Sequence, residues 1–120
     1  MSCLFQSLAQ FVSDNHTDIR AKVCNYLDAN GPVLDGVRTD EIFDGEYIST
    51  MRKGSTWGGG VEIQAACCIY NMTVVVSSTR HRDRSNRPIV FVPVQGMTLI
   101  TAFLSWTGSH YTASRPILYA

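Results

Sequence analysis

Apolar residues in the first part of the chain recur with the spacing of amphipathic helices. One such stripe predicts a helix over residues 3–12 and consists of Leu4, Phe5, Leu8 and Phe11. A second helix is expected to start after the capping candidates at 13–15 and to stop at Gly31-Pro32. Its inward face is predicted to hold Ile19, Val23, Tyr26 and Leu27.

Two more helices are predicted before the pattern changes. Segment 39–53 has acidic residues in its first turn and Gly54 beyond its end, and Gly45 interrupts it. Segment 54–71 is a glycine-rich turn that leads into a helix. The inward positions of that helix are expected to be Val61, Ala65, Cys68 and Ile69.

From Met72 onward the pattern is that of strands. β-Branched and aromatic runs, separated by turn residues, occupy 72–77, 87–94, 97–106 and 110–119. The basic stretch 80–87 has no aromatic residue and is interpreted as a solvated hairpin tip. Because helices lead and strands follow, the predicted fold class is α+β, with helices packed on a mostly antiparallel or mixed sheet.

Composition narrows the function classes. The 120 residues suit one domain, 1–120, and the longest apolar runs are strand-sized, so no membrane partner is expected. Ten basic and ten acidic residues balance to zero net charge, which excludes a dedicated nucleic-acid binder. No secretory leader pattern opens the chain, so we expect a reducing, cytoplasmic location.

The cysteines and histidines do not have the spacing of a metal site, and no cofactor is expected. Adjacent Cys67 and Cys68, like Cys24, are interpreted as small core residues rather than a disulfide framework. His16 is expected on an exposed turn, and His81 lies inside the basic stretch. Both are therefore interpreted as surface residues.

Cys3 and His110 are the residues with candidate chemistry. Cys3 heads a predicted helix, where unpaired backbone N–H groups and the positive end of the dipole favour a nucleophilic thiolate. His110 follows a Gly-Ser turn at the entrance to a strand, where its ring can be held in one orientation and reached as a general base. A structural histidine is the alternative. Only the fold can bring the two together as a Cys–His pair that attacks carbonyls.

Three segments together resemble the ovarian tumour (OTU) family of cysteine proteases, most of which are deubiquitinases. "CLFQSLAQF" matches the family's nucleophile motif from the cysteine onward. "WGGGVEIQAA" matches a middle block at Trp57, Gly58, Glu62 and Ala65, and "GSHYTAS" matches the strand that begins with the catalytic histidine. The resemblance spans nearly the whole chain and implies an OTU-like, papain-like fold.

The resemblance implies that Cys3 attacks the carbonyl of a ubiquitin C-terminal glycine joined to lysine, with His110 moving the proton. Backbone N–H groups around the cysteine would stabilise the oxyanion. Trp57, Gly58 and Gly59 would line the channel for the Gly-Gly tail; alternatively, Trp57 fills the core and the glycines form a helix entry turn. Glu62 is expected to be structural, because a carboxylate in a first helical turn serves the backbone amides.

The chain departs from the family pattern in two places. Only Met1-Ser2 precede Cys3, where the family has an acidic residue and a glycine, so domain 1–120 is expected to lack residues upstream of the nucleophile. Thr112 stands where the family often has Asp or Asn, so the third triad member is unassigned and Thr112 is its candidate.

The leading hypothesis is a cysteine-dependent deubiquitinase. Its expected partners are ubiquitin or a ubiquitin-like modifier, polyubiquitin chains or ubiquitylated proteins. The alternatives are a catalytically impaired OTU-fold module that binds or scaffolds ubiquitin, a viral protease that processes its polyprotein in the host cytoplasm, and an α+β interaction domain with chance motif matches.

Overall fold

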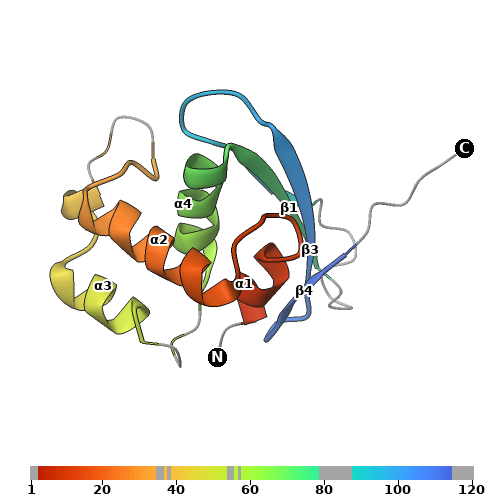
Figure 1. The fold of residues 1–120 in the computed structure, drawn as a ribbon, viewed down its shortest axis with the longest axis horizontal. Helices are drawn as coiled ribbons and strands as arrows, with labels where there is room; N and C mark the ends of the chain where they lie inside the picture. The colour runs from red at the N-terminus through yellow and green to blue at the C-terminus, as the bar shows by residue number, and fades with distance from the viewer. Residues whose placement is uncertain are drawn as a thin grey trace, which may run out of the picture.

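The computed structural model describes residues 3–34, 37, 39–53, 56, 58–78 and 88–114 (Figure 1). The helical elements come first: α1 (Cys3–Leu8), α2 (His16–Asp28), the 3-10 turn η1 (Thr39–Glu41), α3 (Gly45–Met51) and α4 (Gly60–Tyr70). The strands follow: β1 (Met72–Ser78), β2 (Ile89–Phe91), β3 (Ile100–Trp106) and β4 (Tyr111–Ala113). This order confirms the predicted α+β class.

The strands form a mixed sheet in the order β2-β1-β3-β4. The central pair, β1 and β3, is parallel, and the two outer pairings are antiparallel. Alternate positions of the central strands are buried beneath the helices, which lie on one face of the sheet (Figure 1). These sheet positions are Met72, Val74, Val76, Ala102 and Leu104.

The first two helices start where the sequence predicts. Asn15 caps α2, because its side chain accepts a hydrogen bond from the Asp18 amide at 2.9 Å. The first helix is shorter than predicted: α1 ends at Leu8, and the chain turns as the Phe11 amide donates to the Leu8 carbonyl at 3.0 Å. The prediction of a helix to residue 12 is therefore wrong at its C-terminal end.

The predicted third helix is two elements instead of one. The Asp44 side chain accepts a hydrogen bond from the Tyr47 amide at 2.9 Å and so starts α3 at Gly45. A side chain that caps a helix stands outside it, so the helical pattern breaks at Asp44 and only a 3-10 turn precedes it. The single helix over 39–53 is thus corrected.

The buried face of α4 also differs from the prediction. Ala65 is buried as expected, whereas Val61, Cys68 and Ile69 are only half-buried. The buried residues of this helix are Glu62, Ile63, Ala65, Ala66 and Cys67. Nearly every position of α4 is apolar, so its periodicity does not select one face.

The remaining predictions concern the cysteines, His16 and the basic stretch 80–87. Cys24 and Cys67 are fully buried, as predicted for small core residues, whereas Cys68 is half-buried. The prediction of an exposed turn at His16 is wrong, because His16 is the first residue of α2 and is half-buried. The basic stretch 80–87, with His81, lies outside the described residues, as does the end of the last predicted strand.

Arg20 joins three helices in the core and thereby fixes the position of α1. It is 5% exposed, and its guanidinium donates to the Met51 carbonyl of α3 at 2.8 Å. The same guanidinium lies 4.5 Å from the centre of the Phe5 ring of α1, which is a cation–π distance. A buried cation needs such partners, so α1, α2 and α3 are held in register around it.

Candidate active site

Cys3 is the first residue of α1, and the core behind it is tightly packed. Cys3 itself is half-buried, while Leu4 and Phe5, the next two residues, are 1% and 0% exposed. Gly58 packs directly on this turn: a Cβ atom there would lie 2.7 Å from Leu4 Cδ2 and 3.2 Å from the Phe5 ring. The absence of a side chain at Gly58 therefore lets the backbone close on the helix that starts with Cys3.

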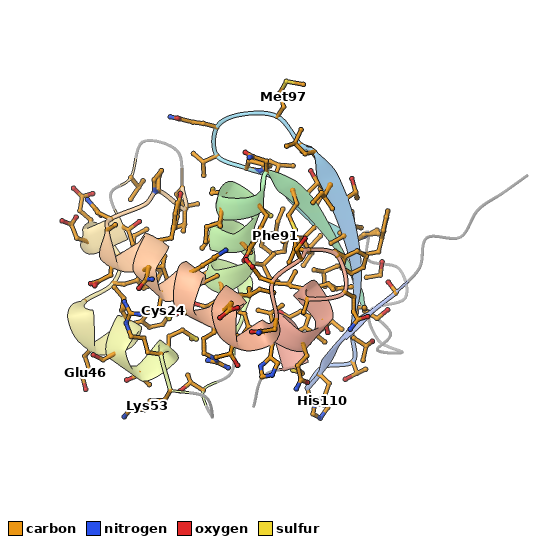
Figure 2. The ribbon with its side chains drawn as sticks, viewed as in Figure 1. Cys24, Glu46, Lys53, Phe91, Met97 and His110 are labelled. Atoms are coloured by element: carbon orange, nitrogen blue, oxygen red, sulfur yellow. The ribbon has the colours of Figure 1, made fainter. Side chains whose placement is uncertain are left out.

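His110 is exposed and stands in the turn between β3 and β4, where Figure 2 labels it. Thr107 closes this turn. Its amide donates to the His110 carbonyl at 3.0 Å, and its hydroxyl accepts from the His110 amide at 3.1 Å. Gly108, inside the turn, has φ +102°, a conformation that favours glycine. The backbone of His110 is thus fixed while its ring stays at the surface.

The structure packs α1 against β4, so the helix headed by Cys3 lies beside the strand that follows His110. A cavity of about 620 Å³ opens between these elements. Its lining includes Cys3, Gln6, Ser7 and Gln10 from one side and Tyr111 and Thr112 from the other. The Ser7 hydroxyl contacts both α1 and β4, because it lies 2.7 Å from the Cys3 carbonyl oxygen and 3.1 Å from the Tyr111 carbonyl oxygen.

Tyr111 lines the same cavity as Cys3. Its ring packs on Trp106, with 4.6 Å between centroids. Burial raises the pKa of Tyr111, and the nearby Cys3 and Glu62 raise it further because a tyrosinate would be repelled by their negative forms. The tyrosine therefore stays protonated and gives the wall beside Cys3 a neutral surface.

Glu62 has the structural role that the sequence predicts. Its side chain is 1% exposed, and its two oxygens accept hydrogen bonds at 2.7 Å from the Tyr47 hydroxyl and from the Gly59 amide. The second bond caps α4. Burial raises the pKa of the Glu62 carboxyl above its ordinary value, although both hydrogen bonds act against that shift.

The structure brings some predicted site residues together and leaves others apart. Cys3 and Thr112 border the same cavity, and Thr112 is an exposed residue of β4, whereas His110 is not among the residues that line the cavity, so the Cys3–His110 pair stays a prediction. Gly58 packs on α1, and Gly59 is the N-cap of α4. Trp57 lies outside the described residues, so its predicted place in the substrate channel stays a prediction.

Sequence reasoning missed Ser7 and the two glutamines that line the cavity. The available signal was the position of Ser7, which lies four residues after Cys3 and inside the apolar stripe of α1. A serine that is 6% exposed at such a position needs a hydrogen-bond partner. The identity of that partner, Tyr111, depends on the fold.

A second hollow, of about 250 Å³, is lined in part by α4 and is apolar. Its walls include Leu34, Ile42, Val61 and Phe91, which is labelled in Figure 2. Leu34 and Ile42 are 57% and 40% exposed. Exposed apolar side chains gathered around a hollow are typical of a surface that binds other molecules.

A sequence model of the family described as OTU-like cysteine protease matches residues 2–111, a range that includes Cys3 and His110. The chain belongs to the OTU-like cysteine protease family. This OTU domain is 24% identical over 117 residues to OVARIAN TUMOR DOMAIN-containing deubiquitinating enzyme 7 of Arabidopsis thaliana. The match covers 95% of this chain and 30% of that protein, so the chain spans under a third of the length of its curated relative.

Solved OTU domains have the same fold. The OTU domain of OTUD1 is 21% identical with a TM-score of 0.66, over 93% of this chain and 77% of that chain. The viral OTU domain protease from Dera Ghazi Khan virus is 18% identical with a TM-score of 0.62, over 95% and 76%. The Hazara virus OTU bound to ubiquitin is 23% identical with a TM-score of 0.61, over 98% and 77%. The predicted OTU-like fold is confirmed.

The four cysteines of this OTU domain form no disulfide, and only Cys3 and Cys68 are partly exposed, because Cys24 and Cys67 are buried. Among the residues that the structure describes, no cluster of His, Cys, Asp or Glu could hold a metal ion. Within the same part of the chain, no helix is long and apolar enough to span a membrane.

Proposed function

We propose that this OTU domain is a cysteine-dependent deubiquitinase, a thiol isopeptidase that hydrolyses the bond between the C-terminal glycine of ubiquitin, or of a ubiquitin-like modifier, and a lysine. The observation that supports the proposal most directly is the packing of α1, which starts at Cys3, against β4, which starts directly after His110. A helix-borne thiol in an open cavity, with an exposed imidazole one residue before the strand that forms the opposite wall, suits nucleophilic acyl transfer.

The proposed reaction proceeds in two steps. Cys3 Sγ attacks the glycine carbonyl and gives up its proton to His110, so a tetrahedral intermediate forms. When this intermediate collapses, the C–N bond breaks and His110 protonates the leaving lysine amine. Water, activated by the same imidazole, then hydrolyses the thioester and regenerates the thiol.

The substrate side of the proposal draws on two features. The Hazara virus OTU was solved with ubiquitin bound, which supports ubiquitin as the partner here. Trp57, Gly58 and Gly59 would line the channel for the narrow Gly-Gly tail, because glycines let an extended peptide approach the backbone closely. Polyubiquitin chains and ubiquitylated proteins are the substrates that follow.

The experiment that tests the proposal uses ubiquitin with a thiol-reactive C-terminal warhead and intact mass spectrometry. We expect one adduct in the wild-type protein and in Cys68→Ala, and none in Cys3→Ala. Cys68 is the matched control because it is also a half-buried free cysteine. An adduct that persists in Cys3→Ala would contradict the assignment of the nucleophile.

The second candidate is a catalytically impaired module that binds ubiquitin. It is favoured by Thr112, which occupies the position of the family's acidic or amide residue but has no charge to stabilise an imidazolium. This candidate predicts that the folded wild-type protein binds ubiquitin without forming the adduct. Addition of an Asp-Gly-Asn sequence before Cys3 then tests the cause: a gain of adduct assigns the defect to the cysteine loop, and no gain favours the binding module.

Thiol chemistry supports a proposed compartment, and the comparisons support a proposed origin. A free nucleophilic thiol is maintained in a reducing environment, so we place the activity in the cytoplasm.

Two of the similar solved structures are viral OTU domains, which supports a viral origin and polyprotein cleavage as a further activity. Cleavage of peptides that span the natural polyprotein junctions, lost in Cys3→Ala, is the corresponding test.

A further inference from the structure

Ser7 lies at the contact between the two elements that hold the proposed catalytic pair. It is the fifth residue of α1, one helical turn after Cys3, and is 6% exposed. Its hydroxyl oxygen lies 2.7 Å from the Cys3 carbonyl oxygen and 3.1 Å from the Tyr111 carbonyl oxygen. One side chain therefore contacts the residue of the nucleophile and the residue that follows the general base.

The Tyr111 carbonyl needs a donor from outside the sheet. The Ser114 amide donates to the Phe103 carbonyl at 2.7 Å, so the backbone polar groups of Ser114 face β3. In an antiparallel pair successive residues turn these groups to opposite sides, and Tyr111 is an odd number of positions from Ser114. Its carbonyl therefore points away from β3, toward α1, where Ser7 donates to it.

The bond to the Cys3 carbonyl is a common one for a helical serine, but the bond to Tyr111 is not local. A serine hydroxyl often donates to the carbonyl four residues earlier on its own helix. The Tyr111 carbonyl is 104 residues away along the chain. The single hydroxyl proton is thus shared between two carbonyl oxygens, which must stay close to each other for both contacts to persist.

We infer that Ser7 is a positioning residue: its hydroxyl holds the first turn of α1 against β4 and so sets the separation between Cys3 and His110. The inference rests on the proposed function, because it concerns the proposed pair. His110 is bonded by its carbonyl and amide to Thr107 and is adjacent to Tyr111, so a shift of Tyr111 relative to α1 moves the imidazole relative to the thiol. Misplacement by about 1 Å costs up to about a hundredfold in rate.

The test measures the rate of alkylation of Cys3 by iodoacetamide in the native protein, with Cys68 in the same sample as an internal reference. This readout needs no ubiquitin, so it is independent of the modifier that the protein acts on. We expect Ser7→Ala to slow Cys3 alkylation about tenfold or more. In a His110→Ala background we expect Ser7→Ala to change the rate less than about twofold, because residues that act as a unit are not additive.

A matched control is Thr39→Val. Thr39 is 1% exposed and donates its hydroxyl to the backbone carbonyl of Gly31, so the variant also removes a buried hydroxyl-to-carbonyl bond between two segments. Thr39 does not line the cavity. We expect Thr39→Val to lower the urea midpoint as Ser7→Ala does and to leave the rate of Cys3 alkylation unchanged. Ser7→Thr keeps the hydroxyl and is expected to restore the rate, even if its extra methyl lowers stability.

The possible outcomes separate a failure of the Cys3–His110 pair from a failure of the Ser7 inference alone. If His110→Ala alone leaves Cys3 alkylation unchanged, the Cys3–His110 pair is wrong, and the proposed function and the Ser7 inference both fall. If His110→Ala slows Cys3 but Ser7→Ala slows it no more than Thr39→Val does, only the Ser7 inference is overturned. Equal Ser7→Ala factors in both backgrounds, or a folded Ser7→Thr protein as slow as Ser7→Ala, overturn it as well.

Discussion

Gly58→Ala tests how tightly the glycine-rich turn holds the helix that begins with Cys3. An alanine Cβ at this position would lie 2.7 Å from Leu4 Cδ2 and 3.2 Å from two atoms of the Phe5 ring. Carbon atoms in ordinary contact are about 3.5–4.0 Å apart, so all three contacts are too short. Leu4 and Phe5 are 1% and 0% exposed and have no solvent into which to move.

Overpacking of this kind costs about 1–3 kcal/mol, and we expect about 2 kcal/mol here because three atoms are affected. With an m-value of about 2 kcal/mol/M, the urea midpoint falls by about 1 M. Displacement of Leu4 also moves Cys3, the residue before it, so we expect slower reaction with the ubiquitin warhead. The assays are urea unfolding followed by tryptophan fluorescence and the rate of adduct formation.

Gly60→Ala is the control within the same glycine run. Its Cβ would lie 3.8 Å from the Phe91 ring, an ordinary contact, so we expect a free energy of unfolding within about 0.5 kcal/mol of wild type. A Gly58→Ala protein as stable as Gly60→Ala would refute the packing argument. If that stable protein also bound ubiquitin more weakly, Gly58 would be a substrate-channel residue rather than a packing residue.

Three further predictions concern stability, each measured by urea unfolding. Gly45→Ala should stabilise the protein by about 0.5 kcal/mol, because no other described segment has an atom within 4 Å of the new Cβ at the start of α3 and the unfolded chain loses freedom; a loss of stability would contradict it. Asn71→Ala should cost about 1 kcal/mol, since residue 71 ends α4 at φ 54°, and Asn71→Gly should not. The folded-state pKa of Glu62 is raised, so its contribution to stability is present below pH 4.5 and is lost as pH rises through the folded pKa. The free energy of unfolding of Glu62→Gln should therefore rise relative to that of the wild type as pH rises from 4 to 7. A difference in unfolding free energy that stays constant with pH would refute the raised pKa of Glu62.

Local sequence patterns predicted the elements well where a capping residue or a β-branched run was decisive. Asn15, one of the capping candidates at 13–15, marked the start of α2, and the β-branched run from Met72 marked β1. The break at Asp44 was also a local feature, but the apolar residues on both sides obscured it. Competition between a cap and a continuing helix is settled by small energy differences, so a boundary of this kind is hard to place from sequence.

The sequence by itself determined which residues can do chemistry: Cys3 at the head of a helix, His110 before a strand, and the motif that relates both to one family. It also determined the class of fold, because helical spacing precedes strand spacing. Tertiary structure alone decided that, on α4, Ile63 and Cys67 face the protein core rather than Val61 and Cys68.

Tertiary structure also decided that β1 pairs with β3 in parallel and that α1 packs on β4. Ser7 acquired its link to Tyr111 only through that packing. The physical reason is the range of the interactions. Periodicity reports which positions of one element are apolar, whereas the element that covers them is chosen by contacts between residues far apart in the chain.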